Sequence, residues 1–424
     1  MSGIEHSEVT RRDFVKTAAA ASLAAAIPGN LRVFAAGTDA IKIGVIGCGG
    51  RGTGATIDCL NSAPGVEVVA LGDLVPDRVE GALKKLRGAF PKQVNVPPNR
   101  CFTGFDNYQQ VCACPDVNLI VTATPPGFRP IHLKAAVEAG KHVFMEKPVA
   151  VDPAGVRSVI ASADLAKQKG LAIVAGTQRR HQKLYLELMK RIQDGQIGEI
   201  VAAQCYWNMG DLWLRKREPN MTEMEWQCRN WLYFTWLSGD HIVEQHVHNI
   251  DVVNWAIGAM PRNIMGMGGR QVRVAPEYGN VFDHFFVEFE YPNGVRVASM
   301  CRQTKGCAER VEERIVGTKG VAHSSGEIKG ENPWKFSGAD PNPYVLEHTD
   351  LIASMRSGNV LNEGRQIAES TMCAIIGRMS AYTGRAISWE WAMNTSKLDL
   401  SPPKYEFGPN PVDPAAVPGT TPLI

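Results

Sequence analysis

The sequence lacks a long apolar run, an excess of either charge and closely paired cysteines. No stretch approaches the roughly 18 apolar residues that a membrane-spanning helix needs, so no membrane anchor is expected. The 45 Lys and Arg residues nearly balance the 43 Asp and Glu residues, which argues against nucleic acid or an anionic membrane as a partner. The ten cysteines contain no CxxC pair and make no dense disulfide scaffold, and Cys112 and Cys114 are expected to pack inside the protein.

What the chain does have is the composition of a globular protein. It contains 424 residues, of which 44% are hydrophobic and 21% are charged. This length exceeds that of one compact domain, so two domains are expected, and the balanced charge suits a small, weakly charged ligand.

The N-terminus resembles an export signal. Arg11 and Arg12 precede an alanine-rich segment that ends near Pro28, and residues 33–36 (VFAA) are small enough for cleavage. This pattern predicts a twin-arginine signal over residues 1–36, export by the twin-arginine machinery and a periplasmic location. The alternative is an ordinary amphipathic helix. Because this export route carries folded proteins, a cofactor can be loaded before export.

A glycine loop follows the first strand-like run. The segment IKIGVIGCGGRGTGA begins at Ile41 and contains Gly47, Gly49 and Gly52 in a GxGxxG pattern, with Gly50 and Arg51 completing the loop. In this context Gly47 permits a tight turn, Gly49 lets the backbone approach a pyrophosphate, and Gly52 lets helix and strand pack closely. We therefore predict a dinucleotide-binding loop.

A carboxylate follows the second strand-like run. Asp73 comes directly after residues 66–72 and lies 21 positions beyond Gly52. A carboxylate there accepts hydrogen bonds from the ribose hydroxyls and repels a 2′-phosphate, so NAD is favoured over NADP.

Strand-like and helix-like patterns alternate up to residue 149, which predicts a doubly wound parallel sheet. Ligands bind such sheets at the carboxyl ends of the strands. Thr124 and the Glu146-Lys147-Pro148 segment both stand at strand ends, so Thr124 and Glu146 are expected at the cofactor and Lys147 where cofactor and substrate meet.

The second half has a different pattern. Strand-like segments alternate polar and apolar residues, and Pro292-Asn293-Gly294 is a hairpin turn between two of them, which predicts antiparallel sheet. We expect an α/β protein with a Rossmann domain at 37–160, a second α/β domain at 161–400, and a proline-rich tail at 401–424 that wraps a surface or stays loosely ordered.

Five of the nine tryptophans lie between Trp207 and Trp236, interleaved with four Arg and Lys residues. Sugar rings stack on indoles, so this stretch is a candidate wall of a carbohydrate site, with Trp207, Trp236 and also Arg180 as substrate contacts. The alternative is packing between domains or subunits, where tryptophan is also frequent.

The segment SGDHIVEQHVHNID, residues 238–251, contains three histidines. As one helix over residues 240–255, it places Glu244 and His248 on one face, where a carboxylate can orient an imidazole that passes a proton. His246 points elsewhere, because residues two apart do not share a face. No metal site is therefore expected unless the helix breaks near His241.

The chain resembles the Gfo/Idh/MocA family of glucose-fructose oxidoreductase and inositol dehydrogenase. The resemblance rests on the loop at 47–52, Asp73, AGKHVFMEKP (139–148), DGQIGEI (194–200), IVGTKG (315–320) and EHTDLIASMRSG (347–358). It implies a Rossmann domain followed by a domain with a large, mainly antiparallel open sheet, and a homo-oligomer. It also implies that Lys147 lies beside the nicotinamide and the substrate hydroxyl. The family's aspartate, histidine and aspartate fall here on Glu244, His248 and Asp251, so glutamate replaces the first acid.

Together these features lead us to expect an exported NAD-dependent oxidoreductase that acts on a secondary hydroxyl of a sugar, polyol or glycoside. Lys147 or His248 is the base, Glu244 supports His248, and the cofactor is tightly bound because no NAD pool is expected outside the cytoplasm. One alternative is a redox-neutral NAD-dependent glycosidase that works by transient oxidation and elimination. Another is a non-catalytic carbohydrate-binding protein.

Overall fold

A computed structural model describes residues 40–424, in the range Ala40 to Ile424. The predicted export signal lies outside these described residues. No helix from residue 40 onward is both long and apolar enough to cross a membrane.

The first part is a six-stranded parallel sheet in the order β3-β2-β1-β4-β5-β6. Its strands are β1 (Ile41–Ile46), β2 (Val66–Asp73), β3 (Cys101–Thr103), β4 (Leu119–Thr122), β5 (His142–Met145) and β6 (Ile173–Ala175). Its helices are α2 (Gly50–Ser62), α3 (Pro76–Ala89), α4 (Asn107–Ala113), α5 (Arg129–Glu138) and α6 (Pro153–Gln168). Strands β1, β2, β4, β5 and β6 are almost wholly buried, as expected when helices cover both faces of a parallel sheet.

The glycine loop has the geometry that its residues predict. Gly47 has φ 93°, in the region that favours glycine, and turns the chain from β1 into α2. A Cβ on Gly52 would lie 1.8 Å from the Gly47 carbonyl oxygen, so only glycine lets α2 pack this close to the turn. At Gly50, by contrast, a Cβ would meet no atom within 4 Å.

The second part is a nine-stranded sheet in the order β14-β13-β12-β11-β7-β10-β9-β8-β15. Its strands are β7 (Ile200–Met209), β8 (Asn263–Gly269), β9 (His284–Glu290), β10 (Arg296–Gln303), β11 (Arg310–Gly317), β12 (Gly320–His323), β13 (Glu327–Gly330), β14 (Trp334–Lys335) and β15 (Ile387–Ser388). All neighbours pair antiparallel except β10 and β7. The predicted hairpin at residues 292–294 joins β9 to β10, so the expected α/β fold class, with a mainly antiparallel second sheet, is confirmed.

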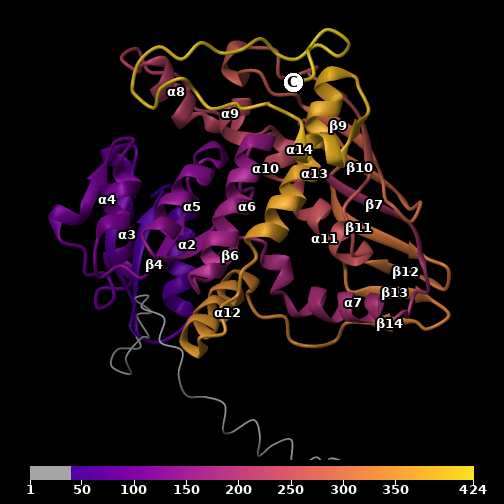
Figure 1. Ribbon diagram of the computed structural model, residues 1–424, viewed down its shortest axis with the longest axis horizontal. Coiled ribbons are helices and arrows are strands. Elements are labelled where there is room, and N and C mark those ends of the chain that lie inside the picture. The colour runs from indigo at the N-terminus through magenta and orange to yellow at the C-terminus, as the bar shows by residue number, and fades with distance from the viewer. Residues whose placement is uncertain (1–39) are drawn as a thin grey trace, which may run out of the picture. The chain divides into compact units, whose positions relative to one another are not determined.

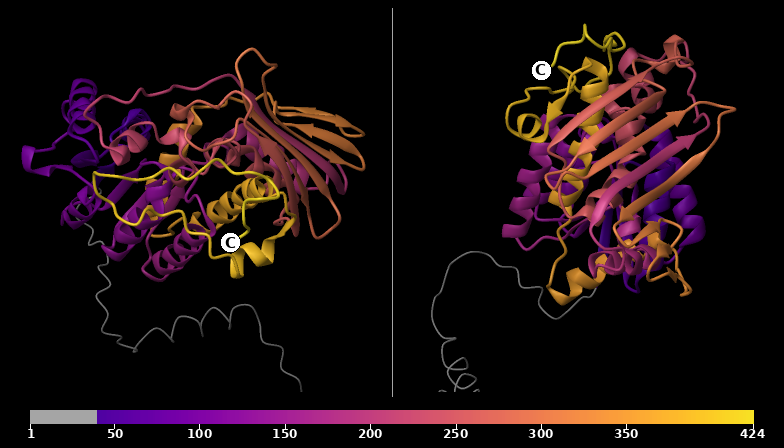
Figure 2. Two further views of the ribbon diagram at one scale, coloured as in Figure 1. Left: turned by 90° about the horizontal axis from the view of Figure 1, so that it is seen from above. Right: turned by 90° about the vertical axis from the view of Figure 1, so that its right-hand side faces the viewer.

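Helices cover one face of this second sheet (Figures 1 and 2). The helices that pack on it are α10 (His241–Glu244), α11 (Val247–Ile257), α13 (Gly364–Thr383) and α14 (Trp389–Asn394). The remaining helices of this half are α7 (Lys183–Gln193), α8 (Glu223–Arg229), α9 (Thr235–Ser238) and α12 (Pro343–Ser357). The long helix α13 packs on β8 and β9 on one side and on α6 on the other. Helix α12 packs on α2, so the last helices return to the first sheet.

The expected domain boundary at residue 160 does not follow the sheet. Residue 160 lies inside α6, and β6 at residues 173–175 still belongs to the parallel sheet. The sequence pattern of β5 clearly indicates a strand, whereas β6 is only three residues long and shows almost no periodic pattern. The last strand of the parallel sheet was therefore missed.

The tail contains no helix or strand after α14 but is tied to the rest of the described chain. Figure 1 shows it in yellow, running past α8 and α9. The Met224 amide donates to the Gly408 carbonyl at 3.1 Å, and Ser396 Oγ donates to the Ile424 carbonyl at 2.6 Å. Of the two predicted alternatives, wrapping a surface is correct.

Candidate functional site

A pocket lies at the carboxyl ends of β1, β2 and β4. We call it the strand-end pocket. The predicted cofactor residues Gly47, Gly49, Asp73 and Thr124 all line it. The first turn of α2 begins at this edge, so its backbone amides and positive end suit a phosphate group.

Asp73 closes the turn between β1 and α2. Its carboxylate accepts hydrogen bonds from the Cys48 amide at 2.6 Å and the Val75 amide at 3.2 Å. Burial nevertheless raises the pKa of this carboxyl, although these backbone donors act in the opposite direction. A partly desolvated carboxylate of this kind can accept hydrogen bonds from ribose hydroxyls.

Arg51 and Glu146 pair with each other and do not line the strand-end pocket. Arg51 Nε donates to Glu146 Oε1 at 2.5 Å, and the same guanidinium lies 3.6 Å from the buried Glu347. Burial lowers the pKa of Arg51, but attraction to Glu146 outweighs it and the pKa is raised. This pair ties the glycine loop to the end of β5, directly before Lys147.

Lys147 is held by Glu244. Its Nζ donates to the Glu244 carbonyl oxygen at 2.6 Å and to Glu244 Oε1 at 3.2 Å. The side chain is 13% exposed, at the same edge of the sheet as Thr124. An ammonium group has three donors, so one remains for a substrate oxygen.

The predicted helix over residues 240–255 is wrong, because it is two helices. Helix α10 ends at Glu244 and α11 begins at Val247. At the break the His246 amide donates to His241 O, and the His248 amide donates to Gln245 O at 3.3 Å. Glu244 and His248 therefore do not share one helical face.

The expected Glu244–His248 pair is consequently not formed. The His248 ring instead stacks on the predicted substrate residue Trp207, with centroids 5.8 Å apart and planes 19° apart. Burial, followed by the positive charge of Lys147, lowers the pKa of His248 well below its usual value. The ring is neutral near pH 7, so one of its nitrogens can accept a hydrogen bond.

Arg180 and Asp251 also pair with each other. The guanidinium makes a two-pronged contact with the Asp251 carboxylate at 2.8 and 2.9 Å, and Ser370 Oγ donates to the same carboxylate. Asp251 is buried, and its carboxylate holds the Arg180 guanidinium in place. Arg180 was predicted to contact the substrate, but its guanidinium already forms an ion pair with Asp251.

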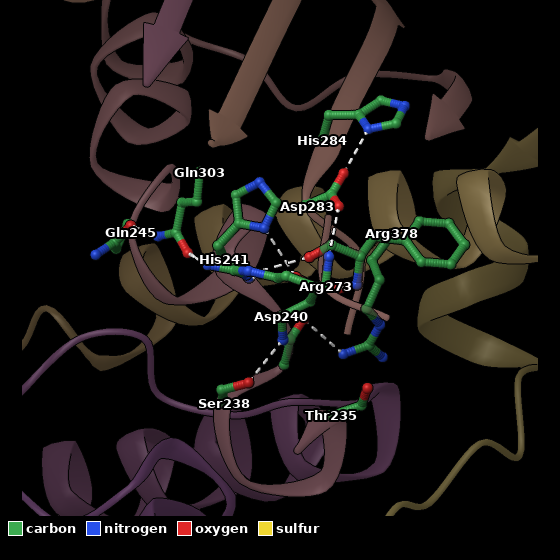
Figure 3. Close-up of polar contacts among 12 residues, drawn as sticks. Thr235, Ser238, Asp240, His241, Gln245, Arg273, Asp283, His284, Gln303 and Arg378 are labelled. Atoms are coloured by element: carbon green, nitrogen blue, oxygen red, sulfur yellow. Dashed lines mark hydrogen bonds and ion pairs between the residues drawn. The ribbon is translucent and has the colours of Figure 1, made fainter. Parts of the chain in front are cut away.

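A buried polar network fixes the start of α10 (Figure 3). Asp240 has φ 71°, rare for a residue with a side chain, and follows Gly239, which also has positive φ. Its carboxylate accepts from the His241 amide at 2.6 Å, the Phe282 amide at 2.7 Å and Tyr382 Oη at 2.6 Å. These contacts hold the four-residue helix whose last residue, Glu244, meets Lys147.

The sequence did not predict the opposite wall of the strand-end pocket. Arg78 lines it from α3, and Cys228, Arg229 and Trp231 line it from the segment around α8. Arg78 stands five residues after Asp73, and this short distance from the predicted ribose-binding acid could have indicated that Arg78 lines the same pocket. The other three belong to the tryptophan- and arginine-rich stretch, but its position over this pocket depends on the fold.

The tryptophan-rich stretch is divided between several environments. Trp236 packs edge-on against Phe128, and its indole N–H donates to Gln227 at 2.7 Å. Trp226 is also buried, so much of the stretch packs domains together. Within residues 40–424 no group of three or more His, Cys, Asp and Glu side chains is arranged to hold a metal ion, and all ten cysteines are free thiols.

A parallel sheet in this strand order, with a glycine loop and an acid after its second strand, defines a dinucleotide-binding Rossmann domain. The chain belongs to the GFO/IDH/MocA family of oxidoreductases. Residues 41–177 match its "Oxidoreductase family, NAD-binding Rossmann fold", and residues 185–323 match the "GFO/IDH/MocA C-terminal domain".

Three relatives carry names from different reaction classes. The 2,7-anhydro-N-acetylneuraminate hydratase of Escherichia coli (strain K12) is 27% identical over 58% of this chain and 62% of its own length. Glycosyl hydrolase family 109 protein 1 of Bacteroides fragilis (strain YCH46) is 23% identical over 66% of this chain and 56% of its own. The inositol 2-dehydrogenase/D-chiro-inositol 3-dehydrogenase of Lactiplantibacillus plantarum is 25% identical over 66% and 70%. The chain thus spans less than two thirds of the first two relatives.

Solved structures share the fold. An aldose-aldose oxidoreductase from Caulobacter crescentus superposes with TM-score 0.64 at 17% identity, covering 82% of this chain and 99% of that one. Scyllo-inositol dehydrogenase from Lactobacillus casei, solved with NAD(H) and scyllo-inositol, gives 0.63 at 17% identity, with the same coverage.

Proposed function

We propose that this chain is an exported oxidoreductase that oxidises a secondary hydroxyl of a sugar, polyol or glycoside with a tightly bound NAD. The observation that carries the proposal is the Lys147–Glu244 pair beside a neutral His248, at the edge of the sheet that also forms the strand-end pocket.

The strand-end pocket fits the adenosine end and diphosphate of a dinucleotide. The contact between Gly52 and Gly47 brings the amide end of α2 to the pocket, and Asp73 stands where ribose hydroxyls bind. Asp73 favours NAD, whereas Arg78 in the same pocket is a residue type that can accept the 2′-phosphate of NADP. Comparing the dissociation constants of NAD and NADP tests which side chain dominates.

The proposed chemistry divides between two side chains. The residues of the strand-end pocket would hold the dinucleotide, whose nicotinamide would supply the acceptor for the hydride of the substrate carbon. The free donor of Lys147 binds the substrate oxygen and stabilises the negative charge that grows on it, while Glu244 fixes the lysine. Neutral His248 accepts the hydroxyl proton, which becomes strongly acidic as hydride leaves the carbon, so even a base with a lowered pKa can take it, and Trp207 keeps the imidazole in place.

Trp207 also supports a carbohydrate or polyol substrate. Its indole stacks on His248 at the end of β7, and the next strand places Val311, which is exposed, opposite it. An apolar ring face beside donors and acceptors suits the apolar face of a sugar ring. The inositol dehydrogenase and aldose oxidoreductase relatives fit this class.

A second candidate is a redox-neutral reaction, in which transient oxidation acidifies a neighbouring C–H, a glycosidic bond is eliminated and hydride then returns. The similarity to a glycosyl hydrolase and to a hydratase favours it. The same Lys147 and His248 would serve both reactions.

The proposal of export to the periplasm rests on Arg11, Arg12 and the alanine-rich segment that follows. Fractionation of the producing cell tests it: the protein is expected in the periplasm, and Arg11→Lys with Arg12→Lys should keep it in the cytoplasm. A wild-type protein found only in the cytoplasm contradicts the proposal.

Cofactor and reaction are tested in sequence. The folded protein is purified, denatured by heat, and the released small molecules are identified by mass spectrometry. NAD is expected, and a protein that neither carries nor binds any nicotinamide dinucleotide is not an enzyme of either kind. Isotope-labelled glycosides and polyols are then incubated with the loaded protein. Net oxidation yields a keto product, whereas the redox-neutral reaction yields a cleaved glycoside with no change in the cofactor's oxidation state.

A further inference from the structure

The strand-end pocket has two walls from distant parts of the chain. One wall consists of the glycine loop and the ends of β1, β2 and β4, whereas Cys228, Arg229 and Trp231 form part of the other. We call residues 223–238 the roof and residues 405–410 the strap. A ligand in the pocket lies between the first sheet and the roof.

Arg229 joins the roof to the first turn of α3. Its Nη2 and Nη1 donate to Asp77 Oδ1 and Oδ2 at 2.9 and 3.2 Å, which is a two-pronged ion pair between residues 152 positions apart. Arg229 Nε also donates to Glu225 at 3.0 Å, so the guanidinium is oriented from its own helix. The hydrogen bond from Arg229 lowers the pKa of Asp77, which keeps this carboxylate charged at neutral pH.

Apolar contacts press the roof onto the loop after β4. Phe128 lies on this loop, lines the pocket and packs edge-on against Trp236. A Cβ on Gly127 would lie 2.2 Å from the Trp236 carbonyl oxygen, so the two backbones are in direct contact.

The strap holds the roof from the far side. Gln227 in α8 donates to the Asn410 carbonyl at 2.6 Å and accepts from Asn410 Nδ2 at 2.8 Å, and both side chains are buried. Phe407 packs on Phe105, a lining residue of the pocket, with ring centroids 5.1 Å apart. The strap thus touches both walls, and the views in Figure 1 and Figure 2 show the tail passing over this part of the chain.

We propose that the roof and strap form a clasp over the adenosine end of the cofactor, with Arg229–Asp77 as its latch and Cys228 and Trp231 as nucleotide-contacting residues. The inference rests on the proposed dinucleotide and explains how the protein keeps it. Release requires the roof to lift, so opening of the clasp sets the rate at which the cofactor leaves.

The latch makes release sensitive to salt. Asp77 is 58% exposed, so dissolved ions screen its attraction to Arg229. Because an exposed pair contributes little, we expect its removal to accelerate release by only about five-fold.

The test measures the release of NADH from the full-length protein. Protein loaded with NADH is mixed with a large excess of NAD, and the decay of the bound NADH fluorescence gives the release rate. Arg229→Ala and Asp77→Ala should each accelerate release by about five-fold, and the double variant should be no faster than either single one, because both remove the same contact. Sodium chloride at 0.5 M should accelerate release from the wild type but not from the variants.

Arg365→Ala is the matched control. Arg365 forms a comparable exposed ion pair with Asp164, with 2.9 Å between nitrogen and oxygen, and neither residue lines the pocket. It should leave the release rate unchanged. Asn410→Ala tests the strap separately and should also accelerate release.

Unchanged release in Arg229→Ala and Asp77→Ala, or equal acceleration in Arg365→Ala, overturns the clasp while leaving dinucleotide binding intact. A wild type that binds no NADH at all overturns the proposed function, and the clasp with it.

Discussion

At the scale of single residues, the site depends on how Lys147 is held. Two of its three donors go to the carbonyl and carboxylate of Glu244, so its amino group has one defined direction left for a substrate. Arginine or a shorter amine could not reproduce this geometry. Glu244, which replaces the family's usual aspartate, is therefore the hydrogen-bond partner of Lys147 and not of His248.

Removal of this amino group should strongly lower turnover but leave the cofactor bound. Lys147→Ala is expected to lower kcat by about 10²–10⁴-fold, the range for loss of a positioned proton or charge donor. Steady-state kinetics and the nucleotide content of the purified variant check both points. Lys134→Ala serves as a control, because Lys134 is exposed on α5 and pairs only weakly with Glu138. Full turnover in Lys147→Ala would remove the lysine from the mechanism.

Residues whose place is set by a local turn were predictable from the sequence, whereas side-chain contacts between distant parts of the chain were not. Gly47, Gly49 and Asp73 line the pocket as expected, because strand, turn and helix signals surround them. The partner of His248 was mispredicted. A side chain such as Trp207, which lies 41 residues before His248 on a strand, cannot be assigned by helical spacing.

At the scale of elements, the β1–α2 turn was predictable and the α10–α11 break was not. A run of apolar residues followed by three spaced glycines leaves one reasonable structure. Residues 240–255 contain no proline or glycine, so their pattern is that of one helix. The break instead follows from tertiary contacts: Asp240 is held by Phe282 and Tyr382, and Gln245 bonds Gln303 from β10.

Two neighbouring glycines of the β1–α2 turn should respond differently to alanine. Gly52→Ala places a methyl group 1.8 Å from a backbone oxygen, which cannot move without shifting Gly47. We expect a loss of about 2–4 kcal/mol of unfolding free energy together with weaker nucleotide binding. Gly50→Ala meets no atom within 4 Å and is the matched control for stability. Denaturant unfolding of both variants measures the difference, and equal stability would contradict close packing at Gly52.

At the scale of the whole described chain, buried histidines couple stability to pH. Burial lowers the pKa of His132, His246 and His348 to about 3 and that of His142 to about 4. In the unfolded chain these histidines become protonated near pH 6.5. In the folded protein they stay neutral until the pH is far lower. The free energy of unfolding therefore falls as the pH drops below about 6.5. The decrease is about 1.4 kcal/mol per pH unit for each histidine that is protonated in the unfolded chain but neutral in the folded protein.

His181 acts in the opposite direction. Burial lowers its pKa, but hydrogen bonds with Asp350 and Glu363 outweigh this and raise it to about 9. Its contribution is complete below about pH 6.5 and is lost as the pH rises through 9. We expect maximal stability close to neutral pH, with a steep acid limb.

Denaturant unfolding between pH 5 and pH 9 measures this profile. His348→Phe should reduce the slope of the acid limb by the contribution of one proton. His348 already packs against Phe144 with ring centroids 4.0 Å apart, and both of its ring nitrogens lack a hydrogen-bond partner in the described structure. An acid limb unchanged by this substitution would contradict the assigned role of His348.

The last feature at this scale is the outer face of the second sheet, which no helix of residues 40–424 covers (Figure 2). Strand register aligns Met267, Phe286, Met300 and Tyr206 in one row across β8, β9, β10 and β7. Met267 is 67% exposed, and Phe286 and Met300 are each 40% exposed. A continuous apolar row of this kind favours association, and its repetition on identical chains suits a symmetric contact.

We therefore expect a homo-oligomer formed through this row. Phe286→Glu combined with Met300→Glu places charge at the centre of the contact and should shift the sedimentation coefficient to that of a monomer, because burying unpaired carboxylates is costly. Val274→Glu is the control, since Val274 is 68% exposed but lies outside the nine strands. If the wild type sediments as a monomer, or if the double variant keeps the wild-type mass, the outer face is not the contact, and its apolar row must be tolerated in water as it stands.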